Sequence, residues 1–331
     1  MTRAVTRRNA LRIIGAGLAL PAGILGLRAA RGLPRPVRWH GEALGALGGM
    51  TLWHSNPEVA KRAIARMRVE IDRLETVFSL YRTESELSRL NREGVLAHPS
   101  RDLVEVFDQS RRIAEISGGA FDPTIQPLWQ LYSQGAASWD RATLDAALAR
   151  VDYTAVSLGA GQIRFERPAM SASLNGIAQG YITDRITEIL GNEGFESAVI
   201  ELGETRALGS APGGQPFAIG LTDPRTPGNI ERDIGLENAA LSVSGGYGLR
   251  FKAPEAHHIF DPTTGTSANR LIQVCVVSPR AIWADALSTA IYVGGEAAAR
   301  GLLASYPSSH AILTRNDGTA IELRGGPVTA A

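Results

Sequence analysis

A carboxylate and a hydroxyl stand four residues apart in the last third of the chain. Residues 284–290 read Ala-Asp-Ala-Leu-Ser-Thr-Ala, a helix-like run, and residues four apart lie on the same helical face. Asp285 and Thr289 would therefore present their oxygens together. Such hard ligands suit Mg²⁺, which keeps several waters and bridges to substrate phosphates. Because acids and hydroxyl residues near a helix start also serve as caps, the spacing alone leaves both interpretations open.

Two histidines precede a turn shortly before this segment. Residues 257–265 read His-His-Ile-Phe-Asp-Pro-Thr-Thr-Gly, which predicts a strand-like entry into a Pro/Gly turn. A histidine at such a place can act as a general base or contact a phosphate. Alternatively, Asp261 bonds its own backbone in the turn and the histidines are surface groups.

Two segments rich in small residues could accept an anion. Residues 118–124 (Gly-Gly-Ala-Phe-Asp-Pro-Thr) follow a predicted helix, and residues 175–181 (Asn-Gly-Ile-Ala-Gln-Gly-Tyr) open another. Small residues let a ligand approach the backbone, and a helix start offers free amides to a group such as pyrophosphate. The chain has no Walker loop, dinucleotide fingerprint, Gly-x-Ser-x-Gly, His-Glu-x-x-His or Cys-x-x-Cys motif, so the usual hydrolase and zinc interpretations lose support.

The elements that must position these residues form a mixed set. Asn56-Pro57-Glu58 predicts a helix start, and an apolar face continues to Phe78. Further helices are predicted at about 102–117, 140–150, 176–190 and 283–293. Strands are predicted at 51–54, 155–158, 163–165, 198–202, 217–221, 241–244, 272–277 and 311–314. Since they do not alternate regularly, the prediction is an α+β fold of mixed sheets with packed helices.

The first 30 residues predict an export signal. Arg7 and Arg8 precede an apolar stretch that ends in small residues, as in a twin-arginine signal peptide. Such a leader implies a periplasmic protein, for which association with the membrane stays open. An uncleaved membrane anchor is the alternative, although the run is shorter than a spanning helix requires. Residues 31–331 are predicted to form a single domain.

Composition narrows the functional classes. The 331 residues are 44% hydrophobic and 20% charged, as in ordinary globular proteins. The formal net charge is +1, and removing the five arginines of residues 1–30 leaves about −4, so no nucleic-acid partner is expected. The one cysteine, Cys275, lies in a β-like apolar run, where a small core hydrophobe is a better interpretation than a nucleophile.

Several short blocks, taken in order, resemble the ApbE family of FAD:protein FMN transferases over about residues 40–325. The blocks are residues 78–81 with 85–91, 119–124, 175–181 with Asp184, 206–209, 242–245, 258–262 with 264–265, and 284–286 with 289–290. Each block alone is weak, but their order is typical of the family. The resemblance implies an ApbE-like flavin transferase fold.

The resemblance also implies a role for individual residues. Mg²⁺ would be held against the pyrophosphate of FAD, the substrate, by Asp285, Thr289 and the carbonyl of Ala178. His258 matches the catalytic histidine of the family. The residues expected at the flavin nucleotide are Leu44, Tyr81, Ala120, Phe121, Asp122, Asn175, Tyr181 and Ile259. FMN would pass to a threonine or serine of an acceptor flavoprotein, and AMP would leave.

This chain departs from the family pattern at a few positions. Residues 44–46 read Leu-Gly-Ala where the family usually has Met-Gly-Thr. Ser173 and Asn175 replace residues of the usual Asp-Leu-Gly-Gly pattern. Gln179 stands where a lysine is usual, and Glu204 stands where an aspartate is usual. The variant resembles the NosX subgroup, which implies a membrane-bound acceptor of the nitrous-oxide respiratory system and a role in nitrous-oxide reductase maturation. An Mg²⁺-dependent FAD hydrolase and a non-enzymatic FAD-binding assembly factor remain alternatives.

Overall fold

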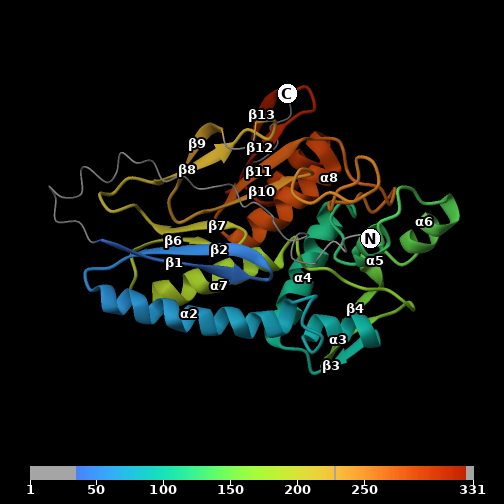
Figure 1. The fold of residues 1–331 in the computed structure, drawn as a ribbon, viewed down its shortest axis with the longest axis horizontal. Coiled ribbons are helices and arrows are strands. Elements are labelled where there is room, and N and C mark those ends of the chain that lie inside the picture. The colour runs from blue at the N-terminus through green and yellow to red at the C-terminus, as the bar shows by residue number, and fades with distance from the viewer. Residues whose placement is uncertain (1–34, 227–228, 326–331) are drawn as a thin grey trace, which may run out of the picture.

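An eight-stranded antiparallel sheet forms the centre of the molecule (Figure 1). The computed structural model describes residues 35–226 and 229–325, so the predicted leader at 1–30 lies outside the described residues. The strand order is β1-β2-β6-β7-β10-β11-β12-β13. In chain order the strands are β1 (Pro36–Ala43), β2 (Ala46–Trp53), β6 (Ser197–Glu201), β7 (Thr205–Gly209), β10 (Ala240–Gly245), β11 (Gln273–Ser278), β12 (His310–Thr314) and β13 (Ala320–Arg324).

Helices cover one face of this sheet, and a hairpin covers the other. The helices are α2 (Pro57–Phe78), α7 (Ala178–Asn192) and α8 (Ala281–Ser305), with α4 (Arg101–Ile116) packed behind them. The hairpin is β8 (Phe217–Thr222) with β9 (Ile230–Leu236). Because side chains alternate across a strand, Val274 and Val276 join the core on the helix side, while Cys275 and Val277 join the core under the hairpin.

A smaller region follows the C-terminal end of α2. It contains a three-stranded sheet of order β3-β5-β4, short helices and a separate aromatic cluster around Phe260. Its elements are α3 (Glu86–Glu93), β3 (Val95–Ala97), α5 (Gln126–Ser133), α6 (Arg141–Leu148), η2 (Tyr153–Ala155), β4 (Val156–Gly159) and β5 (Gln162–Phe165). Within the described ranges, no helix combines the length and apolarity needed to cross a bilayer.

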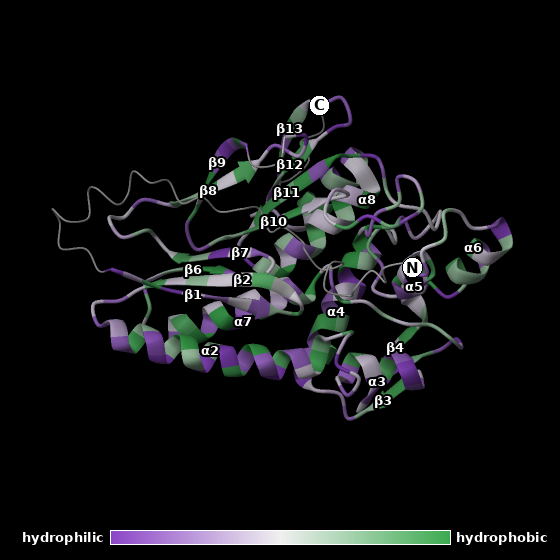
Figure 2. Cartoon of the chain, in the orientation of Figure 1, coloured by the Kyte–Doolittle hydropathy of each residue, from purple (hydrophilic) through white to green (hydrophobic). Residues whose placement is uncertain are grey.

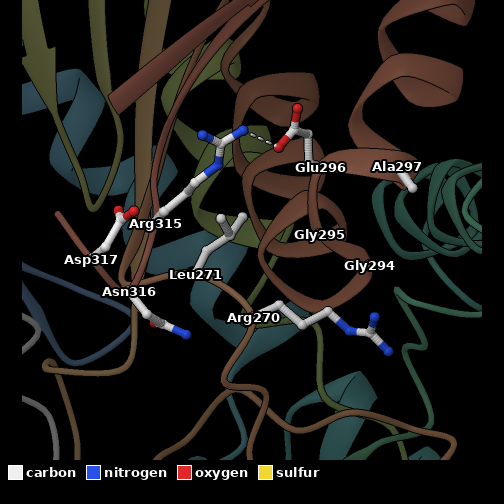
Figure 3. A pocket seen from close by; sticks show the side chains of 9 residues that line it. All are labelled: Arg270, Leu271, Gly294, Gly295, Glu296, Ala297, Arg315, Asn316 and Asp317. Atoms are coloured by element: carbon white, nitrogen blue, oxygen red, sulfur yellow. Dashed lines mark hydrogen bonds and ion pairs between the residues drawn. The ribbon is translucent and has the colours of Figure 1, made fainter. Parts of the chain in front are cut away.

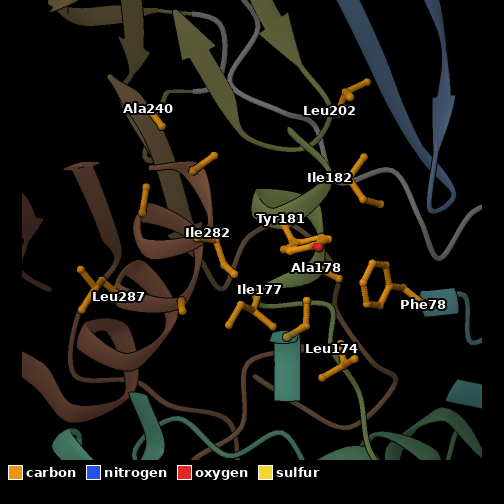
Figure 4. Close-up of a cluster of buried hydrophobic side chains, with 14 of the residues drawn as sticks. Phe78, Leu174, Ile177, Ala178, Tyr181, Ile182, Leu202, Ala240, Ile282 and Leu287 are labelled. Atoms are coloured by element: carbon orange, nitrogen blue, oxygen red, sulfur yellow. The ribbon is translucent and has the colours of Figure 1, made fainter. Parts of the chain in front are cut away.

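Local sequence explains why α2 forms where it does. The Asn56 side chain accepts a hydrogen bond from the amide of Glu58, and Pro57 occupies the first turn. Hydrophobic and hydrophilic patches alternate along the helix (Figure 2), because one stripe of it is buried. Its last residue, Phe78, packs edge-on against Tyr181 of α7 in the main core (Figure 4).

The structure confirms the α+β prediction and the five predicted helices, with differences at the ends. The fifth helix extends to Ser305 and not Val293, and Gly295 interrupts it with a φ of 76°. The prediction missed α3, α5 and strands β1, β3, β7, β9 and β13. Cys275 is buried, as expected for a core residue, and burial raises the pKa of its thiol to about 12.

Asp184 of α7 caps α8 from outside that helix. Its carboxylate accepts hydrogen bonds from the amides of Ala281 (2.8 Å) and Ile282 (3.1 Å), the first two residues of α8. It also forms ion pairs with Arg206 (2.9 Å) and Arg280 (3.3 Å). Since the cap residue Arg280 has no capping side chain of its own, Asp184 fixes where α8 begins.

Asp184→Ala is expected to lower the free energy of unfolding by about 3 kcal/mol, because it leaves two buried amides without their acceptor and Arg206 without the carboxylate of its closest ion pair. Urea unfolding measures this difference. Glu188→Ala provides the matched control: Glu188 is on the same helix and also pairs with Arg280, but it is exposed. Its removal should cost less than about 1 kcal/mol. Equal effects of the two changes would show that Asp184 is not a cap of this importance.

Candidate active site

Asp285 lies in the first part of α8, directly against the start of α7. Its Oδ2 accepts a hydrogen bond from the backbone amide of Gly180 at 3.0 Å, and its side chain is buried. Ala178 is the first residue of α7. A Cβ on Gly180 would lie 2.4 Å from the carbonyl oxygen of Ala281, so only glycine permits this approach. The packing of α7 on α8 therefore brings Asp285 and the first turn of α7, which contains Ala178, together.

Thr289 follows one turn later and faces two of the predicted small-residue segments. A Cβ built on Gly176 would lie 3.2 Å from Thr289 Oγ1 and 3.3 Å from the Phe121 ring. The segment before α7 therefore passes between Thr289 and Phe121. Ala120, beside Phe121, approaches Gly294 farther along α8. Segments 118–124 and 175–181, far apart in sequence, thus meet along α8.

A second buried carboxyl, Glu204, contacts Asp285. It lies in the tight turn between β6 and β7, where Gly203 has a φ of 101°. Its carboxyl also contacts the Ser242 hydroxyl, yet Oε2 receives no hydrogen bond. Burial raises the pKa of Glu204 to about 7, and burial together with Glu204 raises the pKa of Asp285 well above its usual value.

These two carboxyls fit a bound divalent cation. No basic side chain is among the groups that shift either pKa, so the pair must share a proton or hold a cation. In residues 35–226 and 229–325 no cluster of three or more His, Cys, Asp or Glu forms a metal site. The donors at hand are a carboxylate, the Thr289 hydroxyl and main-chain carbonyls, a set that suits Mg²⁺ better than zinc.

The two adjacent histidines have different environments. His257 is buried and uses both ring nitrogens, with Nε2 donating to the carbonyl of Ala268 (2.8 Å) and Nδ1 accepting from the amide of Ile259 (3.3 Å). Its position is structural. In His258, Nδ1 lies 3.3 Å from the carbonyl of Leu249. Because a carbonyl can only accept, Nδ1 carries the hydrogen, and the Nε2 lone pair is left to accept a proton.

Burial, with a smaller contribution from His257, lowers the pKa of His258 to about 4. The imidazole is therefore neutral at pH 7, the form that a general base requires. A neutral ring also costs less to bury than a cation beside a second histidine.

Asp122 uses its carboxylate to shape its own loop. Oδ1 accepts from the amide (2.7 Å) and hydroxyl (2.6 Å) of Thr124, and Oδ2 accepts from the amide of Tyr153 (3.0 Å). Burial raises the pKa of Asp122 to about 6. Its contact with the flavin nucleotide stays a prediction, but the structure already gives Asp122 the task of holding the Phe121 loop.

The other residues predicted to contact the flavin nucleotide do not all lie beside Asp285 and Thr289. Tyr181 points into the main core, where its hydroxyl donates to Asp102 at 2.7 Å and its ring meets Phe78 (Figure 4). Ile259 is buried and Asn175 is exposed. Leu44 lies in the β1–β2 turn, and its amide donates to Glu75 at 2.8 Å.

Tyr81 belongs to the loop after α2 and is 45% exposed. Its neighbour Arg82 pairs with Glu75, the same carboxylate that holds Leu44. Glu75 therefore holds both the Leu44 turn and the residue that follows Tyr81, and the contact of Leu44 and Tyr81 with the nucleotide remains a prediction.

A pocket of about 420 Å³ lies beside the interruption of α8 (Figure 3). It is lined by Arg270, Leu271, residues 294–297 and residues 315–317. An ion pair between Arg315 and Glu296 (2.7 Å) closes one side. None of the predicted site residues lines this pocket, so it is separate from the Asp285 site.

Comparison with known proteins identifies the family to which the chain belongs. The model of the ApbE family matches residues 46–313, so the chain belongs to the ApbE family. It is 31% identical to an FAD:protein FMN transferase of Treponema pallidum, covering 72% of this chain and 73% of that protein. A Vibrio cholerae protein of the same name is also 31% identical, with 70% and 74% covered.

Solved structures show the same fold. The ApbE protein of Thermotoga maritima superposes with a TM-score of 0.78 at 25% identity, covering 87% of this chain and 96% of that one. The flavin transferase ApbE of Vibrio cholerae gives a TM-score of 0.75 at 24% identity, with 88% and 98% covered. The predicted ApbE-like fold is therefore confirmed.

In the sequence, Glu204 was apparent only as a replacement for an aspartate, and its contact with Asp285 was not predicted. Ser244 and Ser288, which touch the site from β10 and α8, were given no role. The one signal in the sequence for the burial of Glu204 is the apolar strand β6 that precedes it. Its contact with Asp285 has no local signal, because Asp285 lies on a helix distant in sequence.

Proposed function

We propose that this transferase moves FMN from FAD to a threonine or serine hydroxyl of an acceptor protein, with Mg²⁺ required and AMP released. The observation that carries the proposal is the paired, buried Asp285 and Glu204 at the start of α7, one turn from Thr289. The names of the relatives in Treponema pallidum and Vibrio cholerae support the same activity.

Asp285, Thr289 and the Ala178 carbonyl would hold the cation, which when bound draws charge from the pyrophosphate oxygens. The acceptor hydroxyl oxygen attacks the FMN-side phosphorus, the bond from that phosphorus to the bridging oxygen breaks, and AMP departs with that oxygen. His258 Nε2 takes the hydroxyl proton and later releases it to solvent. Gly180 lets α7 pack directly against Ala281, and Gly176 lets the segment before α7 pass close to Thr289, so both glycines bring the proposed ligands together.

The test mixes the protein with FAD, Mg²⁺ and a candidate acceptor domain. A fluorescent flavin band that survives denaturing electrophoresis, and that disappears with EDTA, is the expected result. AMP released at the same rate without any acceptor would instead identify an FAD hydrolase. FAD recovered intact with no AMP would identify a binding factor.

We further propose that the acceptor is a membrane-bound flavoprotein of the nitrous-oxide respiratory system and that the chain acts in the periplasm. The paired arginines Arg7 and Arg8 and the resemblance of residues 175–181 to the NosX subgroup support this assignment. Expression of the full chain with and without Arg7→Lys and Arg8→Lys tests export. The full chain should reach the periplasm, and the double variant should stay in the cytoplasm. The same distribution of the two proteins between the compartments would contradict twin-arginine export.

A further inference from the structure

A chain of buried hydroxyls connects β10 to the turn of α8 that carries Asp285 and Thr289. Ser244 Oγ lies 3.4 Å from Thr289 Oγ1 and 2.8 Å from Ser288 Oγ, and Ser242 Oγ lies 3.0 Å from Ser288 Oγ. Ser288 Oγ donates to the carbonyl of Asp285 at 2.9 Å. Ser242, Ser244 and Ser288 are all buried.

The β10 sequence explains why two serines face the helix. Residues 241–244 read Leu-Ser-Val-Ser, and alternate side chains of a strand point to opposite faces. Leu241 and Val243 pack under the β8–β9 hairpin, whereas Ser242 and Ser244 meet Ser288. Polar residues on the inner face of a sheet are costly unless they are hydrogen-bonded, and these are.

The Asp285 carbonyl can only accept, so one arrangement of the network follows when the single hydrogen of Ser288 is donated to it. In that arrangement Ser244 donates to Ser288, and Thr289 donates to Ser244. The lone pairs of Thr289 Oγ1 then face away from Ser244.

We propose that Ser244 and Ser288 are positioning residues that aim the Thr289 hydroxyl at the cation, an inference that rests on the proposed cation site. The route runs from Thr289 through Ser244 and Ser288 to the backbone of Asp285, so it ties the two side-chain ligands together. Groups that orient metal ligands in this way typically contribute 10- to 100-fold to metal affinity.

The test is direct Mn²⁺ binding, followed by electron paramagnetic resonance, with the metal alone and with FAD present. Ser244→Ala should weaken Mn²⁺ binding about tenfold. In a Thr289→Val background the same substitution should change affinity less than about twofold, because the ligand through which it acts is gone. A buried serine on another helix, Ser110, donates to the Val106 carbonyl, so Ser110→Ala is the matched control and should bind Mn²⁺ as the wild type does.

Circular dichroism establishes that each variant is folded. The positioning role is wrong if Ser244→Ala binds Mn²⁺ like the wild type. It is also wrong if Ser244→Ala weakens Mn²⁺ binding by the same factor in the wild-type and Thr289→Val backgrounds. In both cases the proposed function stands. If the wild-type protein itself binds no Mn²⁺ under either condition, the cation site and this inference both fail.

Discussion

Asp285→Asn is expected to lower the rate of FMN transfer by about 10³-fold or more. An amide is a much poorer cation ligand than a carboxylate, and loss of several kcal/mol of charge stabilisation corresponds to this factor. The shape of the side chain is kept, and the amide oxygen can still accept from Gly180. Single-turnover formation of the covalent flavin product, measured over a range of Mg²⁺ concentrations, gives the effect.

The loss should not come from unfolding. In EDTA the wild-type protein contains two buried carboxyls in contact, and the substitution removes one of them. The free energy of unfolding of Asp285→Asn should therefore equal or exceed that of the wild type. Asp145→Asn, at an exposed aspartate of α6, is the control and should keep full activity. A variant at Asp285 that transfers FMN at the wild-type rate would remove this residue from the cation site.

His258→Ala is expected to reduce transfer about 10²- to 10⁴-fold, the usual contribution of a general base, while FAD still binds. His257→Ala differs in kind. It removes the hydrogen bonds to Ala268 and Ile259, so it should mainly reduce stability. Flavin labelling measures the first effect, and FAD fluorescence titration shows whether binding survives. Unchanged labelling by His258→Ala would exclude His258 as the base.

The pH dependence tests the same assignment. Since the pKa of His258 is lowered to about 4, the ring stays neutral from pH 8 down to about pH 5. Below that range protonation of Nε2 should remove the base. The measured quantity is the transfer rate of the wild type minus that of His258→Ala, both at saturating Mg²⁺. This difference should fall around pH 4. A fall centred near 6.5, the ordinary value for histidine, would show that His258 is not in this buried environment.

The parts of the fold with strong local signals were predictable. Helix α2 was predictable because two signals agree: the capping residues Asn56 and Pro57 mark its start, and an apolar stripe with helical periodicity follows them. The end predicted for α8 at Val293 falls just before its interruption at Gly295. The chain resumes a second helical segment there, and only packing against β12 and β13 reveals it. Edge strands β1 and β13 were missed because much of their surface is exposed and polar.

The candidate site was predictable where its residues share one helix. Asp285 and Thr289 follow from a spacing of one turn, but the contact of Asp285 with Glu204 depends on how a distant β-turn packs, which no local pattern encodes. For Tyr181 the position in the sequence was misleading about its direction. Tyr181 lies three residues after Ala178 in a block that matches the family, yet its side chain points toward Phe78 and Asp102.

Cys275 has a consequence for handling the protein. With a single thiol in the sequence, no internal disulfide can form, and its pKa of about 12 leaves almost no thiolate at neutral pH. Reductants and mild oxidants should therefore not alter the lifetime of the folded protein in storage. The same shielding makes Cys275 a poor place to attach a maleimide dye, so a fluorescent label needs a new cysteine introduced at the surface.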